Sequence, residues 1–195
     1  GRLVQATRKS ALVASTTGAE AVGFVGFARG AREGVFIGFL AVALFLLLSF
    51  SSYDPGDPGW SFSGGNSQIA NQGGVVGAWF SDVFLYLFGY LAYLFPLLII
   101  YGGLLMFQDP HGAHRLTIGY LISRGGGFAM ALAGGSALAT LHYGAAGSLP
   151  LDAGGILGNV VGNGLVSLFN FLGATLFLLA LFLTGVTLFL NLSWL

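Results

Sequence analysis

Four long apolar stretches run through this sequence, at residues 35–51, 83–107, 116–143 and 165–190. At about 1.5 Å per helical residue, each is long enough to cross a bilayer core of roughly 30 Å. A backbone inside hydrocarbon must satisfy its own hydrogen bonds, so each stretch is expected to be a helix. The sequence therefore predicts an all-α integral membrane protein with four transmembrane helices.

The composition supports a membrane protein and excludes several other classes. Of the 195 residues, 55% are hydrophobic and only 7% are charged, whereas soluble domains carry about 25% charged residues. The net charge is zero, which argues against a direct nucleic-acid contact by this chain. The absence of cysteine excludes a disulfide framework and a cysteine-ligated metal site.

The positions of the cations predict how the chain is oriented in the membrane. Cytoplasmic loops are enriched in Lys and Arg. The loops at residues 52–82 and 144–164 contain neither, and Arg124 lies near the predicted cytoplasmic end of the third stretch. All other cations precede the first stretch or separate the second from the third: Arg2, Arg8, Lys9, Arg29, Arg32 and Arg115. We expect both termini to be cytoplasmic, with residues 1–33 as an N-terminal segment and residues 34–195 as the membrane domain.

An internal repeat appears when the sequence is compared with itself at an offset of 81 residues. Residues 37–40 then match residues 118–121, and Gly73, Gly74 and Gly77 match Gly154, Gly155 and Gly158. The offset predicts two tandem parallel hairpins, although chance similarity between apolar segments is the alternative. Residues 73–81 and 154–162, before each returning helix, are apolar enough to lie in the outer interface, as a short helix or as a turn.

The loop after the first stretch is the most distinctive polar segment. Two Asp-Pro pairs enforce turns, because proline fixes its own φ and restricts the residue before it. A stiff turn is one interpretation, and a surface presented to a partner is the other. Two close carboxylates offer too few oxygen ligands to assign a metal site. The candidate partner contacts are Asp54, Pro55, Asp57, Pro58 and Trp60.

Two further sets of residues are candidates for helix packing or subunit contacts. Glycines at four-residue spacing share one helix face and permit close backbone approach. Asp82, Tyr86, Tyr90 and Tyr93 are expected to form one polar stripe on the second span, although they could instead be interfacial residues. The complete candidate set is Gly30, Gly34, Gly38, Asp82, Tyr86, Tyr90, Tyr93, Asn163, Ser167 and Asn170.

No catalytic or cofactor-binding arrangement is recognisable. Pro96 is expected to kink the second span. His111 and His114 have a metal-like spacing, but a real site needs more ligands than Asp109 supplies. We therefore expect a non-catalytic chain with no cofactor.

Several motifs together resemble the N-terminal membrane domain of the FtsK/SpoIIIE family of bacterial DNA translocases. They are SSYDPGDPGWS at residues 51–61, NQGGVVGAW at 71–79 followed by Asp82, FGYLAY at 88–93 followed by Pro96, and LSW at 192–194. The resemblance covers about residues 33–195.

The resemblance implies a four-helix inner-membrane domain that anchors the translocase at the division septum and helps to assemble the division machinery. It also implies septal division proteins as partners, and a homo-oligomer that is hexameric through a separate motor. ATP and magnesium belong to that motor, which these residues do not contain. The alternative from the residues alone is a small polytopic channel or transporter, favoured by the repeat and by Pro96.

Overall fold

A computed structural model describes residues 30–63, 68–108, 118–143, 147 and 149–191. These residues form helices and loops, with no strand among them. The first helix runs over Gly30–Ser51, so it already includes residues on both sides of the boundary expected after residue 33. It is followed by α2 (Gly74–Phe88), the 3-10 helix η1 (Gly89–Tyr93), α3 (Leu94–Gln108), α4 (Ile118–Tyr143) and α5 (Gly155–Leu190).

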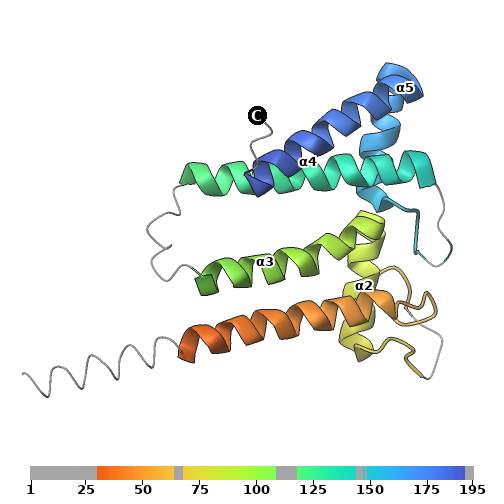
Figure 1. Cartoon of the computed structure of the whole chain (residues 1–195). Helices are drawn as coiled ribbons and strands as arrows, with labels where there is room; N and C mark the ends of the chain where they lie inside the picture. Colours follow the sequence, from red (N-terminus) through yellow and green to blue (C-terminus); the bar gives the residue numbers. More distant parts are fainter. Residues whose placement is uncertain (1–29, 64–67, 109–117, 144–146, 148, 192–195) are drawn as a thin grey trace, which may run out of the picture.

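The helices form two sets with different directions (Figure 1). The first helix, α3, α4 and the second half of α5 run broadly alongside one another. Helix α2 and the first half of α5 run across that set at one end and follow each other along one line. The start of the first helix, the end of α3, the start of α4 and the end of α5 all lie at the opposite end (Figure 1). We call the first helix, α3, α4 and the second half of α5 the crossing helices. We call α2 and the first half of α5 the transverse helices.

Two residues with positive φ separate the transverse helices from the crossing helices that follow them. Gly89 has φ 56° and ends α2, and Asn170 has φ 57° and ψ 173° inside α5. Such values interrupt a right-handed helix. Both predicted spans, at 83–107 and 165–190, therefore contain a bend, and the residues before the bend follow the transverse direction. Residues 89–108 and 171–190 follow the crossing direction and are each about 30 Å long at helical rise.

The same interruption corrects two predictions about the second span. Asp82 and Tyr86 lie on α2, whereas Tyr90 and Tyr93 lie on η1, so the four residues do not form one stripe on one helix. Pro96 is the third residue of α3, where its missing amide is tolerated, so the change of direction occurs at Gly89 and not at Pro96.

The backbone repeats at the offset seen in the sequence. Gly74 and Gly155 both have φ 64°, and the breaks at Gly89 and Asn170 are also 81 positions apart. The helix that precedes each Gly-Gly pair does not follow this offset. Ser49 packs on the turn at Gly73 and Thr140 packs on the turn at Gly154, and Ser49 and Thr140 are 91 positions apart. The match of residues 37–40 with 118–121 is therefore not a structural equivalence, since the first loop is ten residues longer than the second. We call residues 30–108 the first hairpin and residues 118–190 the second.

Helix α4 differs in composition from the other crossing helices. In the described part of the chain, three helical segments are long and apolar enough to span a membrane: Gly30–Ser51, Gly74–Phe107 and Gly155–Leu190. Helix α4 has 26 residues but includes Arg124 and six glycines. Much of its surface, including Ala131, Leu132 and Ala137, is buried against protein. If α4 spans a membrane, a helix with this much protein contact would need fewer apolar side chains facing lipid.

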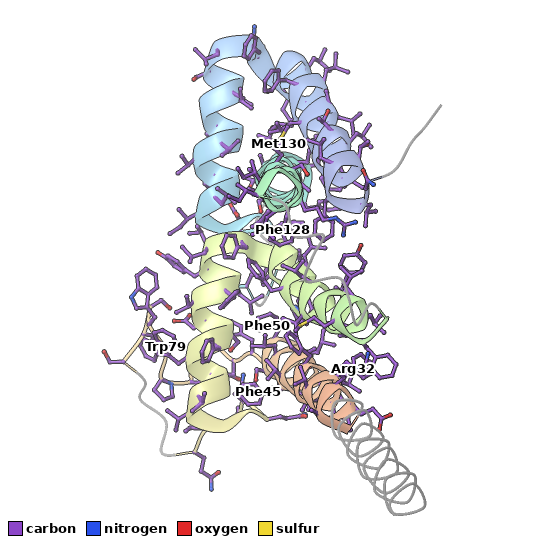
Figure 2. The ribbon with its side chains drawn as sticks, turned by 90° about the vertical axis from the view of Figure 1, so that its left-hand side faces the viewer. Arg32, Phe45, Phe50, Trp79, Phe128 and Met130 are labelled. Carbon is purple, nitrogen blue, oxygen red and sulfur yellow. The ribbon has the colours of Figure 1, made fainter. Side chains whose placement is uncertain are left out.

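Aromatic side chains fill the spaces between the crossing helices. Phe50 lies 5.7 Å from both Phe84 and Tyr93, measured between ring centroids. Phe128 contacts Phe95 at 5.6 Å, which links α4 to α3. Figure 2 shows Phe45 and Phe50 on the side of the first helix that faces α2 and α3, and Phe128 between α3 and α4.

Candidate functional site

Two buried carboxylates hold the loop between the first helix and α2: Asp57 in the loop itself and Asp82 on α2. Asp57 is 5% exposed, and its two carboxylate oxygens each accept a hydrogen bond of 2.8 Å, from the N–H groups of Ala70 and Asn71. The neighbouring Asp54 accepts a bond of 2.7 Å from the Gly56 N–H, which closes a tight turn. Bonds to charged acceptors are stronger than neutral ones, so Asp57 holds the two ends of this loop together.

Asp82 attaches the same loop to helix α2. Its carboxylate accepts bonds from the Ser61 N–H at 2.6 Å, from the Ser61 hydroxyl at 2.7 Å and from the Tyr53 hydroxyl at 3.4 Å. A Cβ atom on Gly59 would lie 2.6 Å from Asp82 Oδ2, so only glycine leaves room for this approach. Burial, together with the negative charge of Asp82, raises the pKa of Tyr53 to about 12. Tyr53 is therefore a neutral donor at physiological pH.

Asn71 joins the loop to the end of the first helix. Its side-chain amide donates to the Ser49 C=O at 2.8 Å, and its Oδ1 accepts from the Gly73 N–H at 2.8 Å. The last carbonyls of a helix lack partners within the helix, and Asn71 satisfies one of them. A Cβ atom on Gly77 would lie 2.6 Å from Ser49 Oγ, so glycine permits the close contact between α2 and the first helix.

The second hairpin uses the same turn with aspartate in place of asparagine. Asp152 Oδ1 accepts from the Gly154 N–H at 3.1 Å and from the Thr140 hydroxyl at 3.3 Å. The Asn159 side-chain amide donates to the other oxygen of Asp152. Residues 71–74 and 152–155 are thus equivalent; we call them the first and second Gly-Gly turns.

These polar residues hold the loop and the two turns in place. No group of three or more His, Cys, Asp or Glu side chains in the described residues could hold a metal ion. His111 and His114 lie outside the described residues. The carboxylates of Asp57, Asp82 and Asp152 already accept bonds from the protein itself, so the arrangement stabilises a fixed surface at the loop end of the helices.

The candidate partner contacts divide into buried and exposed residues. Asp57 is committed to the interior of the loop, and Asp54 and Pro58 are half-buried. Pro55 is exposed, and Trp60 is 56% exposed with its ring edge-on to Tyr86 at 5.4 Å. The loop therefore presents Pro55 and Trp60 on a framework held by Asp57 and Asp82.

A Cβ atom on Gly30, Gly34 or Gly38, the candidate packing glycines of the first helix, would meet no atom within 4 Å among the described residues. A contact of these glycines with another subunit stays a prediction. Glycine packs closely elsewhere, at Gly77 between α2 and the first helix and also between α4 and α5. There a Cβ on Gly185 would lie 2.7 Å from the Gly127 carbonyl oxygen and would also strike the Ala131 nitrogen.

The tyrosine and amide candidates have different surroundings. Tyr93 packs on Phe50, whereas the Tyr90 side chain is exposed and its backbone N–H donates to the Ala153 C=O at 2.9 Å. Asn163, Ser167 and Asn170 are exposed on α5. Among the described residues Asn163 donates to Asn159 Oδ1 at 3.1 Å, and Ser167 donates to the Gly164 C=O at 2.7 Å. A role for these residues in subunit contacts stays a prediction.

Sequence reasoning missed the polar residues that hold the two Gly-Gly turns. They are Ser49, Asn71, Thr140 and Asp152. It also missed Ser136, whose hydroxyl donates to the Phe88 C=O at the end of α2, at 3.5 Å. A signal for two of them was present, because Asn71 and Asp152 both stand two positions before a Gly-Gly pair at the repeat offset. Ser49, Ser136 and Thr140 gave no such signal, since hydroxyls on an apolar helix do not reveal which helix they meet.

The chain is similar to curated bacterial DNA translocases. It is 38% identical over 165 residues to DNA translocase FtsK of Pseudomonas syringae pv. syringae, a match that covers 84% of this chain and 20% of that protein. It is 38% identical over 163 residues to DNA translocase FtsK of Shewanella oneidensis, and 31% identical over 170 residues to that of Vibrio vulnificus. These matches cover 84% and 87% of this chain, and 18% and 17% of the two translocases. This chain therefore spans about a fifth of the length of these relatives. No solved structure matches.

The family assignment follows from the extent of the match. Residues 28–195, which include every described helix, match the family model of the 4TM region of DNA translocase FtsK/SpoIIIE. Three helical segments able to span a membrane agree with a membrane protein. The chain belongs to the family of the 4TM region of the FtsK/SpoIIIE DNA translocases.

Proposed function

We propose that this chain is the non-catalytic membrane anchor of a septal DNA translocase and takes part in assembling the division machinery during cell division and chromosome segregation. The observation that carries the proposal is the coverage of the match: residues 28–195 of this chain correspond to about a fifth of each full translocase. The motor that uses ATP and magnesium would lie in the remainder. An anchor raises the local concentration of a tethered motor without chemistry of its own.

We further propose that the four crossing helices are the membrane spans and that both termini are cytoplasmic. The start of the first helix and the end of α5 lie at the same end of the molecule (Figure 1). Arg124 supports that end as the inner side, because it lies in the first part of α4 and cations are enriched on the cytoplasmic side. Its guanidinium donates to the Tyr101 hydroxyl of α3 at 2.5 Å. The loops and the transverse helices would then lie at the outer face of the inner membrane.

In this arrangement the first loop is the surface that meets septal partners. Trp60 is an exposed aromatic residue on a loop whose backbone is fixed by buried carboxylates. A preordered loop loses little conformational entropy on binding, and aromatic anchors dominate protein interfaces.

Localisation of a fluorescent fusion tests the proposal. The chain fused to a fluorescent protein should form a band at the division septum of dividing bacteria, and Trp60→Ala should reduce that band. Trp79→Ala is the matched control, because Trp79 is also an exposed tryptophan but lies on α2. Uniform membrane fluorescence of the parent fusion would contradict the anchoring role. Solute flux through liposomes that contain the chain would instead favour a channel.

A further inference from the structure

The two hairpins meet in a head-to-tail contact inside the chain. The Tyr90 N–H of the first hairpin donates to the Ala153 C=O in the second Gly-Gly turn, at 2.9 Å. A Cβ atom on Gly155 would lie 2.6 Å from the Leu87 carbonyl carbon, and one on Gly89 would strike the Ala153 oxygen. The bend at residues 88–90 therefore docks on the turn that starts α5. The contact is heterologous, since one surface of a repeat meets a different surface of the next.

Each surface of that contact has an unused counterpart elsewhere in the same chain. At the offset of 81 residues, the bend at 88–90 corresponds to residues 169–171, and the second Gly-Gly turn corresponds to the first. A Cβ atom on Gly74 would meet nothing within 4 Å, whereas its counterpart Gly155 is enclosed by the first bend. Helix α2 and the first half of α5 follow each other along one line, so the two unused surfaces lie at its opposite ends (Figure 1).

The side chains around the second bend match those that are covered at the first. Leu91 contacts the second hairpin, with its Cδ1 3.0 Å from a Cβ built on Gly135, and Leu87 is half-buried. Their counterparts are Leu172, which is 77% exposed, and Leu168, which is 75% exposed. The sequence thus keeps leucine at two positions that are exposed in the described part of the chain.

Backbone conformation at Asn170 is a second, independent observation. The combination of φ 57° and ψ 173° belongs to a region that is essentially restricted to glycine. At the equivalent position of the first bend the residue is Gly89. Strained residues persist where the surrounding structure or a function requires their conformation. At the second bend the Phe171 ring lies 5.3 Å from His142 of α4, whereas Leu168 and Leu172 are exposed among the described residues.

We propose that a second copy of this chain docks its first Gly-Gly turn on the second bend, residues 168–172, and so continues the contact between hairpins from one chain to the next. The Phe171 N–H of one copy then meets the Gln72 C=O of its neighbour, as Tyr90 meets Ala153 within the chain. Because both hairpins present their transverse helices at the same end, the copies lie side by side with one orientation (Figure 1). A heterologous contact of this kind closes into a ring or continues as an open row, depending on the rotation per copy.

Cysteine crosslinking in membrane vesicles tests the docking directly, because the chain has no cysteine of its own. The double variant Gln72→Cys with Phe171→Cys should yield a ladder of dimers, trimers and larger species after treatment with a short bismaleimide. Each single variant should yield no species larger than a dimer. Two differently tagged single variants expressed together should crosslink to each other more than either crosslinks to itself.

Matched controls separate specific docking from collision in the membrane. Val160→Cys with Phe171→Cys uses another exposed residue of the transverse helix and should lose the ladder. Adding Leu172→Ala to the Gln72 and Phe171 pair should weaken the ladder, whereas adding Leu183→Ala, also exposed on α5, should not. Crosslinks only between like positions, or a ladder equal to that of the Val160 pair, would overturn the proposal. Septal localisation of the parent chain is measured separately, so failure here would leave the anchoring role standing.

Discussion

Asn170 combines a polar side chain with a backbone conformation that favours glycine. We predict that Asn170→Gly raises the free energy of unfolding by about 1 kcal/mol, since glycine adopts this conformation without steric cost. Asn170→Ala should lower it, because alanine lacks the side-chain hydrogen bonding that helps asparagine tolerate positive φ. Unfolding by SDS titration in mixed micelles measures both changes.

The first bend provides the reciprocal experiment. Gly89→Asn should destabilise the chain more than Asn170→Ala does, because a Cβ at Gly89 also strikes the Ala153 carbonyl. Equal stability of the parent, Asn170→Gly and Asn170→Ala would show that Asn170 is not strained in solution.

Asn71 is a buried amide with partners on two elements. Asn71→Ala leaves the Ser49 carbonyl and the Gly73 N–H without their side-chain partner, so we expect a loss of about 1–3 kcal/mol in the free energy of unfolding. Gln72→Ala is the neighbouring control: the Gln72 side chain is exposed and should change stability by less than about 0.5 kcal/mol. The two variants are compared by the same SDS titration, and similar values for both would contradict the structural role of Asn71.

The raised pKa of Tyr53 predicts a pH dependence of the loop between the first helix and α2. The pKa increases from 10.0 to about 12 in the folded chain, so the stability that Tyr53 contributes is complete below pH 10 and is lost as the pH rises through about 12. Ultraviolet difference spectra of the parent chain and Tyr53→Phe should differ by one tyrosine that ionises near pH 12. Ionisation of that tyrosine near pH 10 would show that its hydroxyl is not held against Asp82.

At the scale of elements, α4 and α5 approach closely because glycines remove side chains from the contact. Gly185→Leu would force a side chain into the Gly127 carbonyl and the Ala131 nitrogen. We therefore predict that it lowers the free energy of unfolding by about 1–3 kcal/mol. Gly164→Leu is the control on the same helix, because a Cβ there meets nothing within 4 Å. Thermal aggregation of the detergent-solubilised chain should begin at a lower temperature only for Gly185→Leu.

The transverse helices were the elements that hydropathy alone could not separate from the spans. Residues 83–88 and 165–169 are as apolar as the segments that follow them, and a helix on a membrane surface also needs apolar side chains. Periodicity therefore located the apolar residues correctly but gave no sign of the change of helix direction inside two of the predicted spans. The distinguishing feature is the backbone break at Gly89 and Asn170, and a single glycine or asparagine in an apolar run is too weak a signal to predict one.

For the whole molecule, the topology can be tested by labelling single cysteines in intact cells. Trp60→Cys should react with a membrane-impermeant maleimide added outside the inner membrane, because residue 60 is exposed on the outer loop. Ala113→Cys, in the segment between α3 and α4, should react only after the inner membrane is permeabilised. The reverse pattern would place the termini on the outer side and would remove the basis of the anchoring proposal.

The sequence by itself determined that the chain belongs in a membrane, that it is helical and that it contains a repeat. The first two properties follow from the hydrophobicity of whole segments, and the repeat follows from residues that are identical at a constant offset. Both signals sum over many residues along the chain and need no knowledge of which helices touch. The prediction that Asp82 has a special role also came from the sequence, since a carboxylate near hydrocarbon needs partners.

Only the tertiary structure decided which groups those partners are. Asp82 binds Ser61 and Tyr53 of the loop and not another span, and the buried Asp57 holds residues 70 and 71. Glycines of α4 and α5 pack closely within the chain, whereas Gly30, Gly34 and Gly38 meet no described residue. The reason is physical: hydrogen bonds and close helix contacts depend on the rotation and direction of each helix, and one or two backbone dihedral angles, at Gly89 and Asn170, set those directions.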